Sequence, residues 1–96
     1  MSRHRYLVCY DISDDRRRTE VFKLLRDHGD HVQYSVFFCE LTAMELVGLK
    51  ASLADRLNQK TDQVILLDMG ETANSLDMSL ACLGKRYEPM NRVLVV

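Results

Sequence analysis

The residues best suited to chemistry lie at the end of the first apolar run. Residues 6–10 form a short, β-prone apolar stretch, and Asp11 follows it directly. Arg16, Arg17 and Arg18 come soon afterwards, at the start of a predicted helix. Sites in βα units are commonly built at the carboxyl ends of strands, because side chains there leave the core and point into a crevice. A carboxylate that holds a hard cation such as Mg²⁺, beside guanidinium groups that grip phosphate, suits phosphodiester chemistry.

Asp11 also admits a purely structural interpretation. It could cap the turn over residues 12–15 or pair with an arginine, and the arginine run could be a solvated first helical turn. One carboxylate is, in addition, a poor metal site. A homodimer would remedy this if two copies of Asp11 faced each other across a two-fold axis, because two such carboxylates repel each other unless a cation lies between them.

Other polar and aromatic residues are weaker candidates. His31 begins a predicted strand near the end of the first helix, where it could reach a phosphate. Ser35 and Phe37 lie in a segment that alternation places largely in the core, and either could line a dimer interface. His28 closes a helix face and suits packing or capping. The cysteines have no C-x-x-C spacing, so the sequence supports no zinc site.

Hydrophobic patterning predicts the elements that must position these residues. Val21, Leu24, Leu25 and His28 form an apolar stripe, which predicts a helix over residues 14–28 that Gly29 stops. Residues 31–41 are rich in β-branched and aromatic side chains. This segment is long for one strand, so we expect a bend or two strand pieces.

The second helix carries the clearest local signal. Thr42 and Glu45 form a capping box, and Leu41 with Leu46 fits a hydrophobic staple. Residues 63–69 predict another buried strand, closed by Gly70. The order of elements predicts an α+β, ferredoxin-like βαββαβ fold. A further strand over residues 92–96 would add to a sheet edge, such as that of a second subunit.

Length and charge bound the remaining possibilities. The 96 residues fit one domain, with a core over about residues 4–70 and a C-terminal tail over about residues 71–96. Thirteen basic residues against 14 acidic ones exclude a broadly basic nucleic-acid binder, so any such contact needs a local cluster. No stretch approaches 18 apolar residues, and the N-terminal run is too short for a signal peptide. We therefore expect a cytoplasmic protein.

Several of these segments together resemble one family. The Y-D-I element at Tyr10–Ile12, the arginines that follow, and the Q-x-S-V-F element at Gln33–Phe37 resemble the CRISPR-associated small adaptation nuclease, the partner of the CRISPR spacer integrase. The resemblance covers nearly the whole chain. It implies a ferredoxin-like homodimer whose tail strand packs on the partner subunit. It also implies cleavage of RNA or double-stranded DNA with Mg²⁺, or alternatively Mn²⁺, and a role in spacer acquisition in which the dimer bridges integrase dimers and holds duplex DNA.

The same resemblance implies roles for individual residues. It places Asp11 at the dimer interface as the catalytic, metal-binding residue, and Tyr10, Arg18 and Phe37 match other positions of the family's site. Two departures stand out: Phe38 occupies the position of a common family Glu, with Glu40 the nearest acid, and Glu20 replaces a common basic residue. The residues expected to contact nucleic acid are therefore Tyr10, Arg16, Arg17, Arg18, His31, Ser35 and Phe37.

Three functions follow as hypotheses. The first is a metal-dependent endonuclease in which an Asp11 pair holds the metal and Arg18 stabilises charge on the phosphate. A toxin-type ribonuclease of similar fold is a variant of it. The second is a non-catalytic scaffold that binds duplex DNA in the adaptation complex. The third is a regulatory module that binds a small effector at a dimer interface.

Overall fold

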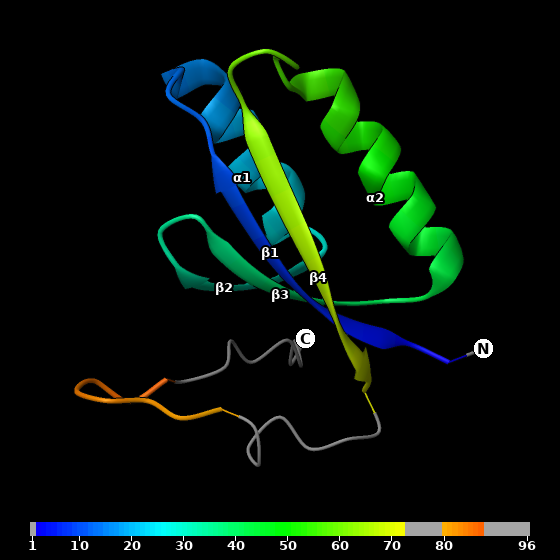
Figure 1. Cartoon of the computed structure of the whole chain (residues 1–96), viewed down its shortest axis with the longest axis vertical. Coiled ribbons are helices and arrows are strands. Elements are labelled where there is room, and N and C mark those ends of the chain that lie inside the picture. Colours follow the sequence, from blue (N-terminus) through cyan, green and yellow to red (C-terminus); the bar gives the residue numbers. More distant parts are fainter. Residues whose placement is uncertain (1, 73–79, 88–96) are drawn as a thin grey trace, which may run out of the picture.

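A four-stranded antiparallel sheet carries both helices on one face (Figure 1). The computed structural model describes residues 2–72 and 80–87. Its elements, in chain order, are β1 (His4–Asp11), α1 (Asp15–Arg26), β2 (Gly29–Gln33), β3 (Val36–Leu41), α2 (Ala43–Arg56) and β4 (Gln63–Glu71). The strand order is β2-β3-β1-β4, and every neighbouring pair is antiparallel. This confirms the predicted ferredoxin-like α+β fold.

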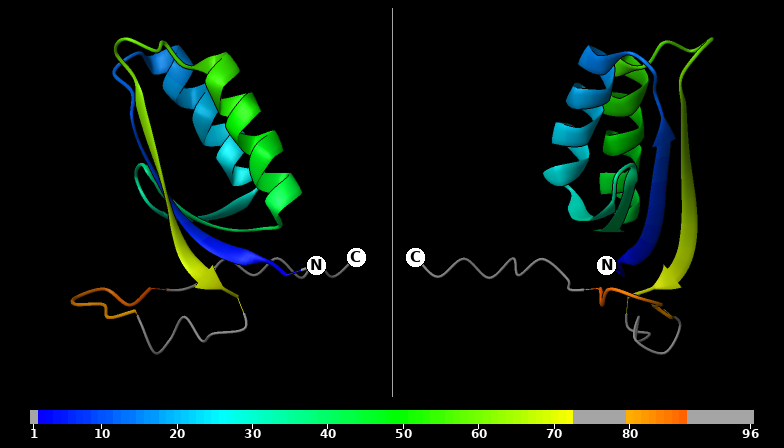
Figure 2. Two further views of the ribbon diagram at one scale, coloured as in Figure 1. Left: turned by 45° about the vertical axis from the view of Figure 1, so that its right-hand side comes forward. Right: turned by 90° about the vertical axis from the view of Figure 1, so that its left-hand side faces the viewer.

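Alternation along β1 sorts its side chains between the two faces of the sheet. Tyr6, Val8 and Tyr10 are buried in the core beneath the helices. Leu7, Cys9 and Asp11 alternate with them and lie on the opposite face, which neither α1 nor α2 covers (Figure 2). We call this second side the open face. α1, β3 and α2 supply further buried core side chains: Val21, Leu25, Phe37, Cys39, Leu41, Leu49 and Leu53.

The C-terminal end of α1 comes two residues earlier than predicted. The helix ends at Arg26, and His28 Nδ1 lies 2.8 Å from the Leu24 carbonyl, so His28 caps the helix as expected. Gly29 does not stop the helix but is the first residue of β2. A Cβ at Gly29 would lie 2.5 Å from Cys39 Sγ and closer still to the Phe38 carbonyl oxygen. Glycine is therefore required here by the close approach of β2 to β3.

The predicted capping box and the divided strand are both confirmed. Thr42 Oγ1 accepts a hydrogen bond from the Glu45 backbone at 3.2 Å, and the Glu45 carboxylate accepts one from the Thr42 backbone at 2.8 Å. Leu41 is buried and Leu46 packs partly against the same core. Residues 31–41 form parts of two strands, β2 and β3, joined by a turn at residues 34–35.

The prediction that residues 63–69 form a buried strand is wrong for one face of β4. Ile65 and Leu67 are 52% and 56% exposed on the open face, because both helices lie on the other side. Phe38 also lies on the open face but is buried, since the ring of Tyr87 packs edge-on against it at 5.9 Å. The predicted strand at residues 92–96 lies outside the described residues. No helix within residues 2–72 and 80–87 is long and apolar enough to cross a membrane.

Candidate active site at the end of strand β1

Asp11 is the last residue of β1 and pairs across the sheet with Gln63 of β4. Its side chain is exposed on the open face. Within the described parts of the chain, the carboxylate forms no hydrogen bond or ion pair. The capping role that Asp11 could have had is taken by Asp14, whose Oδ2 accepts from the Arg17 backbone at 2.9 Å. Asp11 is thus left available for a ligand.

Arg17 is committed to a structural ion pair. Its Nε donates to Asp62 Oδ2 at 2.7 Å and its Nη2 donates to Oδ1 at 3.4 Å. The Asp62 carboxylate is fully buried and also accepts from the Asn58 backbone at 2.9 Å. The hydrogen bond from Arg17, followed by that from Asn58, lowers the pKa of Asp62. Arg17 was predicted to contact nucleic acid. In this structure its guanidinium already binds the Asp62 carboxylate, so a phosphate would have to compete with Asp62 for it.

Arg18 is anchored on the segment that leaves β1. Its Nη1 donates to the carbonyls of Ile12 and Ser13, each at 3.1 Å, and its Nη2 donates to the Asp15 carboxylate. The side chain is still 43% exposed, so the fixed guanidinium faces solvent beside the strand end. Arg16 lies exposed on the same helical turn, and no ion pair links it to another described residue.

A pocket of about 320 Å³ lies on the helix side of the sheet, between α1 and the β2–β3 turn. It unites four of the predicted site residues: Tyr10, Arg18, His31 and Ser35. Thr19, Phe22 and Tyr34 complete its lining, and none of these was predicted as a site residue. The signal that could have found Tyr34 is its place in the Q-x-S-V-F element, immediately before Ser35.

Hydrogen bonds to one carbonyl organise the pocket. His31 Nε2 lies 2.8 Å from the Tyr34 carbonyl oxygen, and the Tyr10 hydroxyl donates to the same oxygen at 3.5 Å. Because a carbonyl only accepts, His31 carries a proton on Nε2. Burial raises the pKa of the Tyr10 phenol, against a smaller opposing effect of the Arg18 cation, so Tyr10 stays protonated at neutral pH.

Phe37 requires a correction to its predicted role. It is fully buried, with its ring centroid 4.9 Å from that of His31 and 6.4 Å from that of Tyr10. A side chain with no exposed surface cannot touch nucleic acid in this conformation. Phe37 instead packs beneath His31 and Tyr10 and supports them.

Glu40 lies at the wrong end of the sheet to replace the missing family acid. It pairs across strands with Arg5, and the two side chains form an ion pair at 3.3 Å. Arg5 is six positions before Asp11 along β1, which corresponds to roughly 20 Å of strand. Glu40 and Asp11 of one chain therefore cannot bind the same cation.

The acids of one chain supply only part of a metal site. Within the described residues, no group of three or more His, Cys, Asp or Glu side chains is placed to hold a metal ion. Asp62, which precedes the Asp11 partner Gln63, is engaged by Arg17 through both carboxylate oxygens. A hard cation needs several oxygen ligands. The donor set of one chain thus fits a divalent cation only if a second carboxylate comes from another molecule.

These features define a class: a small ferredoxin-like α+β protein with a strand-end carboxylate and an adjoining arginine. Residues 4–75 match the family model described as CRISPR associated protein Cas2. The CRISPR-associated endoribonuclease Cas2 1 of Rhodospirillum rubrum is 36% identical over 93 residues, covering 97% of this chain and 90% of the relative. The corresponding Geobacter sulfurreducens protein is 32% identical over 93 residues, covering 97% of each chain. The chain belongs to the CRISPR-associated Cas2 family, which confirms the family resemblance found in the sequence.

Solved structures agree with this assignment. Streptococcus pyogenes Cas2, crystallised at pH 6.5, superposes with a TM-score of 0.73 at 33% identity, covering 83% of this chain and 99% of that one. A chain of a partial Cas6-RT-Cas1–Cas2 complex matches with a TM-score of 0.57 at 25% identity, covering 69% of this chain and 80% of that one.

Proposed function

We propose that this chain is a cytoplasmic, metal-dependent endonuclease that hydrolyses nucleic acid as a homodimer. The observation that carries the proposal is that the Asp11 carboxylate is exposed and accepts no hydrogen bond from another described residue. This carboxylate is exposed at the end of β1, whereas Asp14, Asp15 and Asp62 around it all accept hydrogen bonds from Arg17 or Arg18. The relatives named endoribonuclease favour RNA as the substrate, with duplex DNA as the alternative.

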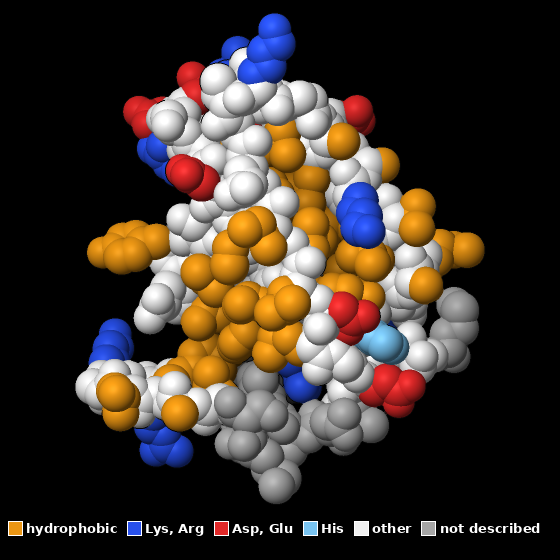
Figure 3. Space-filling view, in the orientation of Figure 1, with side chains coloured by type: hydrophobic (Ala, Val, Ile, Leu, Met, Phe, Trp, Pro, Cys, Tyr) orange, Lys and Arg blue, Asp and Glu red, His pale blue; other side chains and the backbone are white. Residues whose placement is uncertain are grey.

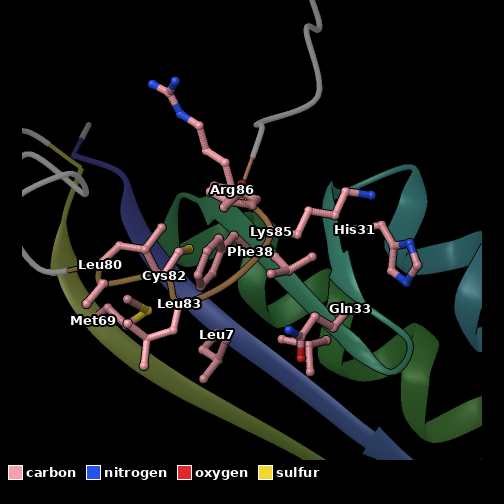
Figure 4. Close-up of a pocket in the computed structure, with 14 residues that line it drawn as sticks. Leu7, His31, Gln33, Phe38, Met69, Leu80, Cys82, Leu83, Lys85 and Arg86 are labelled. Carbon is pink, nitrogen blue, oxygen red and sulfur yellow. The ribbon is translucent and has the colours of Figure 1, made fainter.

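The open face supports the proposed homodimer. Ile65, Leu67 and Met69 of β4 are 52%, 56% and 38% exposed, and the space-filling view shows apolar side chains gathered across this side of the sheet (Figure 3). A groove of about 860 Å³ lies between residues 80–87 and the sheet, with Leu7, Phe38 and Leu83 among its lining (Figure 4). Exposed apolar surface of this kind is typical of an interaction face.

A second copy on the open face would bring the two Asp11 side chains toward a common site. Asp11 lies on the same face as the apolar residues of β4, since Cys9 pairs with Ile65 and Leu7 with Leu67 in the same register. In a two-fold dimer each residue of the face meets its own counterpart or a symmetric partner. The proposed site therefore has one carboxylate from each subunit.

The proposed chemistry assigns a role to each group. The paired Asp11 carboxylates would hold Mg²⁺, or Mn²⁺ as the alternative, and such an ion polarises the phosphate and lowers the pKa of a bound water. Arg18 would stabilise the negative charge that develops on the phosphate oxygens. Its anchoring to the Ile12 and Ser13 carbonyls supports this, because a fixed cation needs little reorganisation during the reaction.

Metal removal tests this proposal on the unmodified chain. Single-stranded RNA is incubated with the purified protein in Mg²⁺, in EDTA, and in EDTA followed by excess Mg²⁺. We expect cleavage to be lost in EDTA and restored by Mg²⁺. Asp55→Asn, purified in the same way, serves as the control. Asp55 is exposed on α2, so this variant should cleave RNA at the normal rate. Cleavage that persists in EDTA would contradict the metal-dependent mechanism.

A second candidate function is a scaffold for the CRISPR integrase during spacer acquisition. It is favoured by one observation: a solved structure similar to this chain is part of a Cas1–Cas2 complex. In this role Arg16, Lys85 and Arg86, all exposed, would contact the backbone of duplex DNA. Spacer acquisition in cells that carry Asp11→Asn separates the candidates. Normal acquisition would favour the scaffold, and loss of acquisition with an intact complex would favour catalysis.

A further inference from the structure

We infer that the pocket between α1 and the β2–β3 turn binds one unpaired nucleobase of the nucleic-acid substrate. The inference rests on the proposed function, because it names the form of substrate that this function would accept. The pocket lies on the helix side of the sheet, across from the side that carries Asp11. It is therefore a second site, linked to the first through Tyr10, the residue before Asp11.

The pocket concentrates aromatic side chains. Two of the four tyrosines and two of the three phenylalanines of the chain line it or support it: Tyr10, Tyr34, Phe22 and Phe37. His31 packs against both phenylalanines, with ring centroids 5.1 Å from Phe22 and 4.9 Å from Phe37, and the two phenylalanine centroids are 5.6 Å apart, so the three rings form one cluster. Stacking on such rings is the main way in which proteins hold single-stranded bases.

Tyr34 supplies an exposed ring on a fixed support. The residue is 93% exposed at the tip of the β2–β3 turn, although most tyrosines in folded proteins are at least partly covered. The turn beneath it is held by the Tyr10 amide, which donates to the Ser35 carbonyl at 3.1 Å, and by His31 on the Tyr34 carbonyl. Because the backbone beneath the ring is held, stacking on a base has to restrict only the rotation of the Tyr34 side chain, which limits the cost in conformational entropy.

Polar groups that line the same pocket can form hydrogen bonds with the edge of a base. Arg18 donates from Nη1 and Nη2 to protein oxygens, and its remaining N–H groups are available at the pocket rim. Thr19 Oγ1 donates to the Asp15 carbonyl, so its lone pairs can still accept. His31 donates from Nε2 to the Tyr34 carbonyl, which leaves Nδ1 as an acceptor when the ring is neutral.

The size and setting of the pocket select an unpaired base. A volume of about 320 Å³ accommodates one nucleotide but no stacked base pair. A base inside a duplex reaches such a pocket only if it leaves the stack and gives up its pairing, which costs free energy. The pocket therefore favours single-stranded nucleic acid, or a loop or frayed end, over intact duplex.

Base-dependent binding provides the test. Two labelled strands of equal length are titrated in EDTA, so that cleavage cannot interfere: an RNA octamer and the matching octamer with abasic sugars throughout. The unmodified chain should bind the RNA more tightly than the abasic strand. Tyr34→Ala should weaken RNA binding by roughly 5- to 150-fold, the range for one stacked base, and leave abasic binding unchanged. Met44→Ala, an exposed apolar residue at the start of α2, is the control and should bind both strands normally.

The outcomes separate this inference from the proposed nuclease. Equal affinity of the unmodified chain for both strands, or an equal loss on both strands in Tyr34→Ala, would overturn the nucleobase site. Circular dichroism of Tyr34→Ala must match that of the unmodified chain, and we expect a match because the side chain is exposed. If Tyr34→Ala loses base-dependent binding while Asp11→Asn keeps both binding and cleavage, the pocket stands and the proposed catalytic role of Asp11 fails.

Discussion

Arg17 and Asp62, 45 residues apart in the sequence, form an ion pair that joins the first turn of α1 to the loop before β4. The next residue after Asp62 is Gln63, which pairs with Asp11 across β1 and β4. The Arg17–Asp62 pair therefore fixes the strand end that carries the candidate catalytic carboxylate.

Substitution of Asp62 should destabilise the fold. Asp62→Asn removes the charge of the carboxylate that Arg17 binds most closely, leaving Asp14 at 3.9 Å as the other acid in reach, and changing one member of a pair whose carboxylate is buried is usually costly. We expect the melting temperature to fall by about 5 °C or more. Thermal unfolding followed by circular dichroism measures this, with the exposed Asp55→Asn as the control that should melt within about 1 °C of the unmodified chain. An unchanged melting temperature for Asp62→Asn would show that the pair contributes nothing.

The lowered pKa values of two aspartates lead us to expect that the fold loses stability in acid. Hydrogen bonding to Arg17 lowers the pKa of Asp62, and hydrogen bonding to the Gly70 backbone, then to His4, lowers that of Asp68. A carboxyl whose pKa is lower when folded stabilises the fold above its unfolded pKa of about 3.9, and this contribution is lost as the pH falls through the folded pKa. Urea unfolding should therefore give similar midpoints between pH 5 and 7 and lower midpoints below about pH 4. For Asp62→Asn this acid dependence should be weaker, and an identical profile would contradict the assignment.

Two glycines should respond in opposite ways to alanine. Gly29→Ala forces a Cβ into the Phe38 carbonyl oxygen, and the strand shift that relieves this should cost about 1–3 kcal/mol or more. Gly48 lies inside α2, and no atom lies within 4 Å of the place that an added Cβ would take, so Gly48→Ala should stabilise by about 0.5–1 kcal/mol. Denaturant unfolding of both variants checks the pair. Equal effects would argue against the close approach of β2 to β3.

The open face should control self-association. Leu67→Asp places a charge among the exposed apolar residues of β4, and we expect it to convert a dimer to a monomer in sedimentation velocity. Val47→Asp is the matched control, because Val47 is 67% exposed but lies on α2, away from the open face. A monomeric unmodified chain, or a dimer lost equally in both variants, would refute the proposed interface.

Local patterns predicted most of the fold. The capping box at Thr42, the cap at His28 and the division of residues 31–41 all depend on neighbours in sequence, and all were confirmed. The exposed face of β4 was not foreseen, because an apolar run does not tell which side of a sheet the helices will cover. The role of Gly29 was also missed, since its constraint comes from β3 across the sheet.

The site was predicted less completely than the fold. The position of Asp11 after an apolar strand was enough to place it at a strand end, and the arginines were correctly placed on the adjoining turn. The partner of Arg17 was invisible, because nothing local links it to Asp62. Phe22 and Tyr34 were likewise missed, since only the folded chain brings α1 against the β2–β3 turn.

The cleavage rate of Asp11→Asn tests the proposed dimeric site most directly. This substitution keeps the shape of the side chain and removes the charge that would hold the cation. Because Asp11 is exposed and makes no hydrogen bond to another described residue, the variant should fold and dimerise like the unmodified chain. We predict that a folded, dimeric Asp11→Asn protein cleaves RNA in Mg²⁺ at least about 100-fold more slowly than the unmodified chain. Cleavage at the unmodified rate would contradict the central claim that the dimer completes a catalytic site at Asp11.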